Sequence, residues 1–127
     1  MTVGDAGLPD ATRLAVDRTR LAYERTLMAW TRTATSLISF GFTIYKFFQY
    51  LRDERQVAED VLGPRGFALL MIGIGLAALV VATVEHRQNM NALRATYGPV
   101  PYSLAAIVAG FIAILGVAGL LVVLLHL

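Results

Sequence analysis

Basic and hydroxyl side chains recur every seven residues in the first half of the chain. This polar stripe consists of Arg18, Arg25, Arg32, Ser39 and Lys46, and Thr43 lies beside it and widens it. Seven residues are nearly two helical turns, so successive members lie about 20° apart and about 10 Å further along a helix axis. Guanidinium groups bind phosphate through paired hydrogen bonds. The polar stripe therefore predicts a helix face that binds anions.

Arg32 is the most informative member of the stripe, because it lies inside the largely apolar segment from Leu27 to Tyr50. An arginine at the centre of a bilayer costs about 2.5–3.5 kcal/mol on insertion scales, so such residues usually face a protein interior or water. A second interpretation is that Arg32 and Lys46 extend their charged ends to the headgroups on the two membrane surfaces. Their alignment with Arg25 favours the first interpretation, since extension to headgroups gives no reason for it.

The composition indicates a membrane protein. Of the 127 residues, 57% are apolar and 16% are charged, whereas about 25% are charged in average globular proteins. A bilayer's hydrocarbon core is about 30 Å thick and is crossed by about 20 apolar helical residues. Three segments have this length: Leu27 to Tyr50, Gly66 to Val84 and Leu104 to Leu125. We therefore predict an all-α membrane protein with three transmembrane helices.

The segment before the first span is expected to belong to the same helix. Residues 1–11 contain two glycines and a proline and are predicted to be a disordered tail, followed by one membrane domain over 12–127. No helix breaker separates an amphipathic helix over 12–26 from the span at 27–50, so the two are expected to be continuous. The apolar run is too long for the core of a signal peptide, and the first span is expected to be retained.

Two loops join the spans at 27–50, 66–84 and 104–125. The first is short and acidic and ends in a Gly-Pro pair, which stops any helix before the second span. The second is expected to begin as a helical extension through Arg94, until Pro99 and Pro101 end it.

Small residues recur at close-packing intervals in the second and third spans. Such faces let helices approach in lipid, although glycine and alanine are also common in membrane helices generally. They are Gly73 and Ala77, Gly75, Ala78 and Ala82, and Ala105, Ala109 and Ala113 beside Gly110 and Gly116.

Basic residues in short flanks predict the orientation of the chain, because they concentrate in the cytoplasm. Six lie on one side of the membrane and three on the other. The first set is Arg13, Arg18, Arg20, Arg25, Arg87 and Arg94, and the second is Arg52, Arg55 and Arg65. The N-terminus is therefore expected inside and the C-terminus outside.

Three helices cannot enclose a hydrated channel around one stripe, whereas several copies in a ring can point their stripes at a common axis. Rings of arginine or lysine line anion and phosphate pores. The stripe therefore predicts a homo-oligomer. Glu24 follows Arg20 by four residues and adjoins Arg25, so it is expected to form a structural ion pair, to link subunits, or to be a solvated acidic residue.

A second basic segment follows the second span. It contains His86, Arg87, Asn89, Asn91 and Arg94, and its two arginines share a helix face at seven-residue spacing. They are expected to extend a basic mouth on the cytoplasmic side. Two alternatives explain why basic residues follow the second span: they bind lipid headgroups, or they only mark the cytoplasmic side of the membrane.

The predicted first helix contains the run Tyr23-Glu24-Arg25-Thr26-Leu27-Met28-Ala29-Trp30-Thr31-Arg32-Thr33. This run resembles the N-E-R-T-F-L-A-W-x-R-T signature of the YidH-like bacterial membrane family, whose function is unknown. Tyr23 and Met28 replace the usual asparagine and phenylalanine, and neither change removes a charge. Over about residues 15 to 125 the domain is also similar to the membrane module of the eukaryotic vacuolar transporter chaperone, which makes polyphosphate and passes it across a membrane.

The resemblance implies that Arg25 and Arg32 match basic positions expected to contact polyphosphate, and that Arg87 matches another. It also implies a ring of five modules, as in the chaperone. The chaperone's polymerase and phosphate-sensing domains have no counterpart in this sequence. The resemblance therefore implies only a membrane module.

We therefore expect a homo-oligomeric module of the plasma (inner) membrane, surrounded by lipids, that forms a basic-lined conduit or binding site for polyphosphate or other anions. The alternative is a non-conducting scaffold or accessory subunit of another membrane protein. Cysteine is absent, and the two histidines are too few for a histidine-built metal site. No nucleophile with a base and no paired carboxylates in a span occur, so we do not expect an enzyme. We also expect no cofactor and no nucleic-acid partner.

Overall fold

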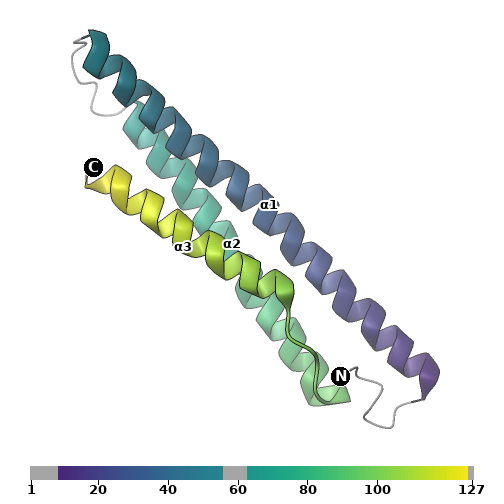
Figure 1. Cartoon of the computed structure of the whole chain (residues 1–127). Helices are drawn as coiled ribbons and strands as arrows, with labels where there is room; N and C mark the ends of the chain where they lie inside the picture. Colours follow the sequence, from purple (N-terminus) through teal and green to yellow (C-terminus); the bar gives the residue numbers. More distant parts are fainter. Residues whose placement is uncertain (1–8, 56–62, 126–127) are drawn as a thin grey trace.

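The computed structural model describes residues 9–55 and 63–125, which form three helices packed side by side (Figure 1). They are α1 (Asp10–Arg55), α2 (Pro64–Tyr97) and α3 (Leu104–Leu124). The described residues contain no strand, and the predicted all-α fold is confirmed. Most of the predicted N-terminal tail and the middle of the first loop lie outside the described residues.

Helix α1 is unbroken over 46 residues, so the predicted continuity between the amphipathic segment and the apolar segment is confirmed. It begins at Asp10, whose carboxylate lies 3.1 Å from the Arg13 guanidinium. At 1.5 Å per residue, a helix of this length extends about 70 Å, roughly twice the thickness of a bilayer's hydrocarbon core. A large part of α1 must therefore project beyond any membrane that it crosses.

Helices α2 and α3 are long and apolar enough to cross a membrane. Only 28% of the most apolar stretch of α2 and 17% of that of α3 are buried inside the molecule. Core helices of soluble proteins bury most of such a surface, whereas these two expose it, as lipid-facing helices do. Large apolar side chains such as Val81, Phe111 and Ile114 point outward.

Local signals in the sequence end α2 and begin α3. Gly98 has a φ of 93°, which favours glycine, and its N–H donates to the Arg94 carbonyl to close the end of α2. Ser103 precedes α3 as the N-cap, and its Oγ accepts a hydrogen bond from the Ala106 N–H at 3.1 Å. At the other end of the bundle, the Arg65 guanidinium donates to the Leu124 carbonyl at 2.7 Å.

The buried face of α1 follows a seven-residue repeat, typical of left-handed helix packing. Its seam consists of Leu27, Ala34 and Gly41, together with Thr31, Ile38 and Tyr45. Around this seam, Leu79 and Ala82 of α2 join Ala105 and Ala109 of α3 in one apolar cluster, and Ile72 and Val123 belong to a second. The N-terminal half of α1 packs through Val16 against Met90 and Leu93 of α2.

Two glycines allow α1 and α2 to approach closely. A Cβ atom on Gly41 would lie 2.9 Å from the Met71 Cβ and 3.1 Å from the Ala68 carbonyl oxygen. A Cβ atom on Gly75 would lie 3.0 Å from the Ile38 Cγ1. By contrast, Gly73 and Gly110 face open space. Of the two small-residue faces in α2, the one through Gly75 therefore packs against α1, and Ala105, Ala109 and Gly116 of α3 are buried in helix contacts as well.

Candidate functional site

The arginines of the polar stripe lie on the surface of α1. Arg18, Arg25 and Arg32 are exposed, and none of their guanidinium groups has a hydrogen bond or ion pair within residues 9–55 and 63–125. Ser39 and Thr43 are exposed as well. The structure thus places five of the six predicted residues on one accessible face.

The position of the stripe follows from the seam that α1 buries. Arg25 precedes the seam residue Leu27 by two positions, and Arg32 precedes Ala34 by two. Two residues correspond to about 200° around a helix, so the stripe points away from α2 and α3. Because stripe and seam both repeat every seven residues, this offset stays constant along the helix. Arg18, Arg25 and Arg32 thus form a row of positive charges that have no partner among the described residues, and this row faces away from α2 and α3.

Lys46 does not share this exposure. Its side chain is half-buried, and its Nζ lies 3.3 Å from the Gln49 Oε1. The same nitrogen lies 5.8 Å from the centre of the Phe42 ring and 5.9 Å from that of Tyr45. These aromatic faces attract the ammonium group. Lys46 is thus held among side chains of its own helix, at one end of the row.

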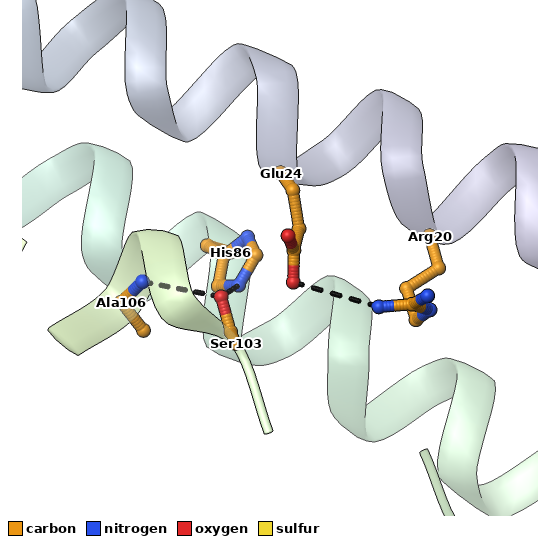
Figure 2. Close-up of polar contacts among 5 residues, drawn as sticks. All are labelled: Arg20, Glu24, His86, Ser103 and Ala106. Carbon is orange, nitrogen blue, oxygen red and sulfur yellow. Dashed lines mark hydrogen bonds and ion pairs between the residues drawn. The ribbon is translucent and has the colours of Figure 1, made fainter. Parts of the chain in front are cut away.

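Glu24 points toward α2 and not along the stripe (Figure 2). Its Oε1 lies 3.7 Å from an Arg20 guanidinium nitrogen, and the two side chains are only 20% and 18% exposed. Neither the Glu24 Oε1 nor the Arg20 Nε has a hydrogen bond among the described residues. Glu24 therefore pairs with Arg20, one turn earlier, and Arg25 has no partner among the described residues.

His86 lies next to this pair and joins α2 to α3 (Figure 2). Its side chain is 4% exposed, and its Nε2 lies 3.0 Å from the Ser103 Oγ. Ser103 thus caps α3 and contacts α2 with the same oxygen atom. Sequence reasoning placed His86 in the basic segment but missed Ser103, which the pattern of a serine directly before an apolar run would have revealed as a cap.

Arg87 and Arg94 lie in a cleft of about 490 Å³ between the C-terminal part of α2 and the beginning of α3. Asn91, Tyr102 and Ser103 also line it. No α1 residue within the described ranges contributes to this lining. Within one subunit, the two arginines therefore form a basic surface separate from the polar stripe, which faces away from α2 and α3.

A smaller hollow of about 140 Å³ lies between α1 and α2, lined by Tyr23, Trp30, His86 and Asn89 among others. Within the described part of the chain, no group of three or more histidine, aspartate or glutamate side chains is arranged to hold a metal ion. The described polar groups include exposed guanidinium groups, which are able to form paired hydrogen bonds with anions.

Comparison with curated proteins and with solved structures finds no match. One family model, described as Domain of unknown function (DUF202), matches residues 18–92. That region begins at Arg18, contains the stripe, Glu24, His86 and Arg87, and ends before Arg94 and α3. The matched region covers more than half of the chain and includes most of α1, with its basic face, and most of the apolar helix α2. The chain is therefore a membrane protein that belongs to the DUF202 family.

Proposed function

We propose that this protein is a homo-oligomeric module of the plasma (inner) membrane, in which the polar stripe of α1 forms a basic-lined conduit or binding site for polyphosphate or other anions. The observation that carries the proposal is the row Arg18, Arg25 and Arg32, which is exposed on the α1 face opposite to α2 and α3 and has no partner among the described residues. The apolar segment of α1 serves as the third membrane span, with the N-terminus in the cytoplasm and the C-terminus outside.

A ring of subunits would shield Arg32 from the hydrocarbon of the bilayer, which a single subunit does not do. Arg32 lies in the part of α1 that would cross the bilayer, and a guanidinium group exposed to hydrocarbon is costly. Around a central axis, the same face would meet water and the stripes of other copies. Each arginine position then becomes a ring of charges whose mutual repulsion a bound anion relieves.

The resemblance of the first helix to the YidH-like family and to the chaperone membrane module supports the choice of anion. Membership of DUF202 is compatible with that resemblance. Arg25 and Arg32 match the basic positions expected to contact polyphosphate, and five copies is the favoured ring size. Phosphate chains suit such a row, because their charges repeat along a line as the arginines do.

The test uses purified protein reconstituted in lipid vesicles and planar bilayers. Wild type is expected to bind polyphosphate and to conduct anions in preference to cations. Arg32→Glu should weaken binding more than Arg32→Ala, and added salt should narrow the difference because it screens charge. Arg13→Ala, on α1 but outside the stripe, is the control and should behave as wild type.

Two outcomes would contradict the proposal. If wild type neither binds polyphosphate nor conducts, and Arg32→Glu fails to insert into the membrane, Arg32 is a topological anchor and a scaffold or accessory subunit is the preferred function. If Arg13→Ala weakens binding as much as Arg32→Ala does, the overall charge of α1 and not the stripe attracts the polyanion.

A further inference from the structure

The cleft between α2 and α3 has the side chains of an anion site. Arg87, Asn91 and Arg94 follow one another at four and three residues, so they line one face of α2. Both arginines are exposed, and neither has a hydrogen bond or ion pair within the described part of the chain. Among the described residues that line the cleft, none is acidic. Within the described part of the chain, an anion that enters the cleft therefore meets two unpaired guanidinium groups and no opposing carboxylate.

The other wall adds polar groups. The exposed Tyr102 brings a hydroxyl group to the cleft beside Ser103, whose Oγ already contacts the Ala106 N–H and His86, directly before α3 begins. Its first turn also lies there, and the N-terminal end of a helix carries a positive partial charge. Each of these elements favours an anion with several oxygen acceptors, such as a phosphate group.

The position of the cleft next to apolar helix surfaces indicates whether the phosphate belongs to a lipid headgroup or to a free anion. The exposed side chain of Ile107 lines the cleft one turn into α3, and Leu104 beside it is 70% exposed. Across the cleft, α2 changes from exposed valines such as Val84 to the polar residues from Glu85 onward. The cleft thus spans the boundary between an apolar helix surface and its polar end. A molecule with a phosphate head and apolar tails matches both halves, whereas a free anion matches only one.

We propose that this cleft binds the headgroup of an anionic phospholipid, with Arg87 and Arg94 on its phosphates and the acyl chains along α3 beside Ile107. The two arginines lie two turns apart, about 10 Å along the axis. A lipid with two phosphates, such as cardiolipin, engages both at once. This site does not depend on the polar stripe, because it lies on other helices and takes a different ligand.

Native mass spectrometry of delipidated protein with added cardiolipin tests the site. The double variant Arg87→Gln with Arg94→Gln should weaken cardiolipin binding about 10- to 30-fold, as expected for the loss of two arginines at a lipid headgroup. The matched control is Arg13→Gln with Arg52→Gln, which removes the same charge from α1 outside the polar stripe and should retain binding. The variant Arg87→Lys with Arg94→Lys keeps the charge and should retain much of the affinity.

Soluble ligands and a neutral lipid distinguish a lipid site from a free-anion site. Glycerophosphate and inorganic pyrophosphate should compete only weakly with cardiolipin, because they lack acyl chains, and phosphatidylcholine should not bind the cleft. Pyrophosphate that displaces cardiolipin at comparable concentrations would overturn the lipid assignment in favour of a free phosphate. Equal losses in the two glutamine variants would show that the charge of the whole chain, not the cleft, attracts the lipid. Either result would leave the polyphosphate proposal untouched, because the Arg32 variants test that proposal separately.

Discussion

At the scale of single residues, the molecule separates charges that are paired from charges that are free. Arg20 and Glu24 point inward toward α2 and lie 3.7 Å apart. Arg25 and Arg32 point outward and have no partner among the described residues. Because Glu24 pairs with Arg20, it does not pair with the outward-facing Arg25. Helix α1 therefore packs against α2 through one face and presents a candidate binding surface on the other.

Replacing Ser103 with alanine tests the junction between α2 and α3. The change removes the cap on the Ala106 N–H and the contact with His86, and it leaves buried polar groups without partners. Loss of an N-cap costs about 0.5–2 kcal/mol, so Ser103→Ala should lower the unfolding midpoint in detergent. Ser36→Ala is the matched control, because the Ser36 Oγ contacts only the Arg32 carbonyl of its own helix. Equal midpoints for the two variants would contradict a structural role for Ser103.

At the scale of helices, the close approach of α1 and α2 determines which face of α1 remains outside. Gly41 and Gly75 let the two backbones approach, and Ala34 and Ala68 add little bulk between them. A larger side chain at this contact would push the helices apart or rotate α1 about its axis. Since the stripe lies almost opposite to the contact, such a rotation would also redirect its arginines.

Alanine substitutions at two glycines measure that approach. A methyl group on Gly41 would lie 2.9 Å from the Met71 Cβ, whereas one on Gly73 would meet open space. Both changes gain the same intrinsic helix propensity, so their difference reports the contact. Gly41→Ala should be less stable than Gly73→Ala by about 1–3 kcal/mol in an unfolding titration. If their stabilities agree, the helices do not approach at Gly41.

The sequence predicted the helices well because their signals are local. The absence of a breaker made α1 continuous, and Gly98 with the following prolines separated α2 from α3. It could not choose between the small-residue faces through Gly73 and Gly75, which have similar spacing, since only the packing with α1 distinguishes them. Seven-residue spacing alone placed Lys46 in the stripe, while the structure holds it half-buried beside Phe42 and Gln49.

The cleft between α2 and α3 was missed for a related reason. The sequence showed that Arg87 and Arg94 share a helix face, but the other wall comes from residues beyond two prolines. Where that wall lies depends on how the Gly98 to Ser103 segment returns to the bundle, which no local pattern specifies. The site is therefore a product of tertiary structure.

At the scale of the whole molecule, a single subunit has two kinds of exposed surface that require different surroundings. Helices α2 and α3 expose large apolar side chains suited to lipid. The polar stripe of α1 exposes arginines that hydrocarbon does not solvate. Both requirements are met when α2 and α3 lie outside and the stripes of several copies lie inside a closed ring. Cyclic symmetry supplies this arrangement, because it repeats one contact until the ring closes.

Purified wild type is therefore expected to form a closed ring of identical subunits, most favourably five, in mild detergent and in lipid nanodiscs. Native mass spectrometry measures the number of copies directly. Arg32→Leu should raise the fraction of monomer on dilution, because it removes the charge that a subunit must shield from lipid. Arg13→Leu is the control: its partner Asp10 is exposed, surface pairs contribute little, and the ring should persist. A wild-type protein that stays monomeric in both environments would exclude a ring, and with it the conduit, since a single stripe encloses no axis.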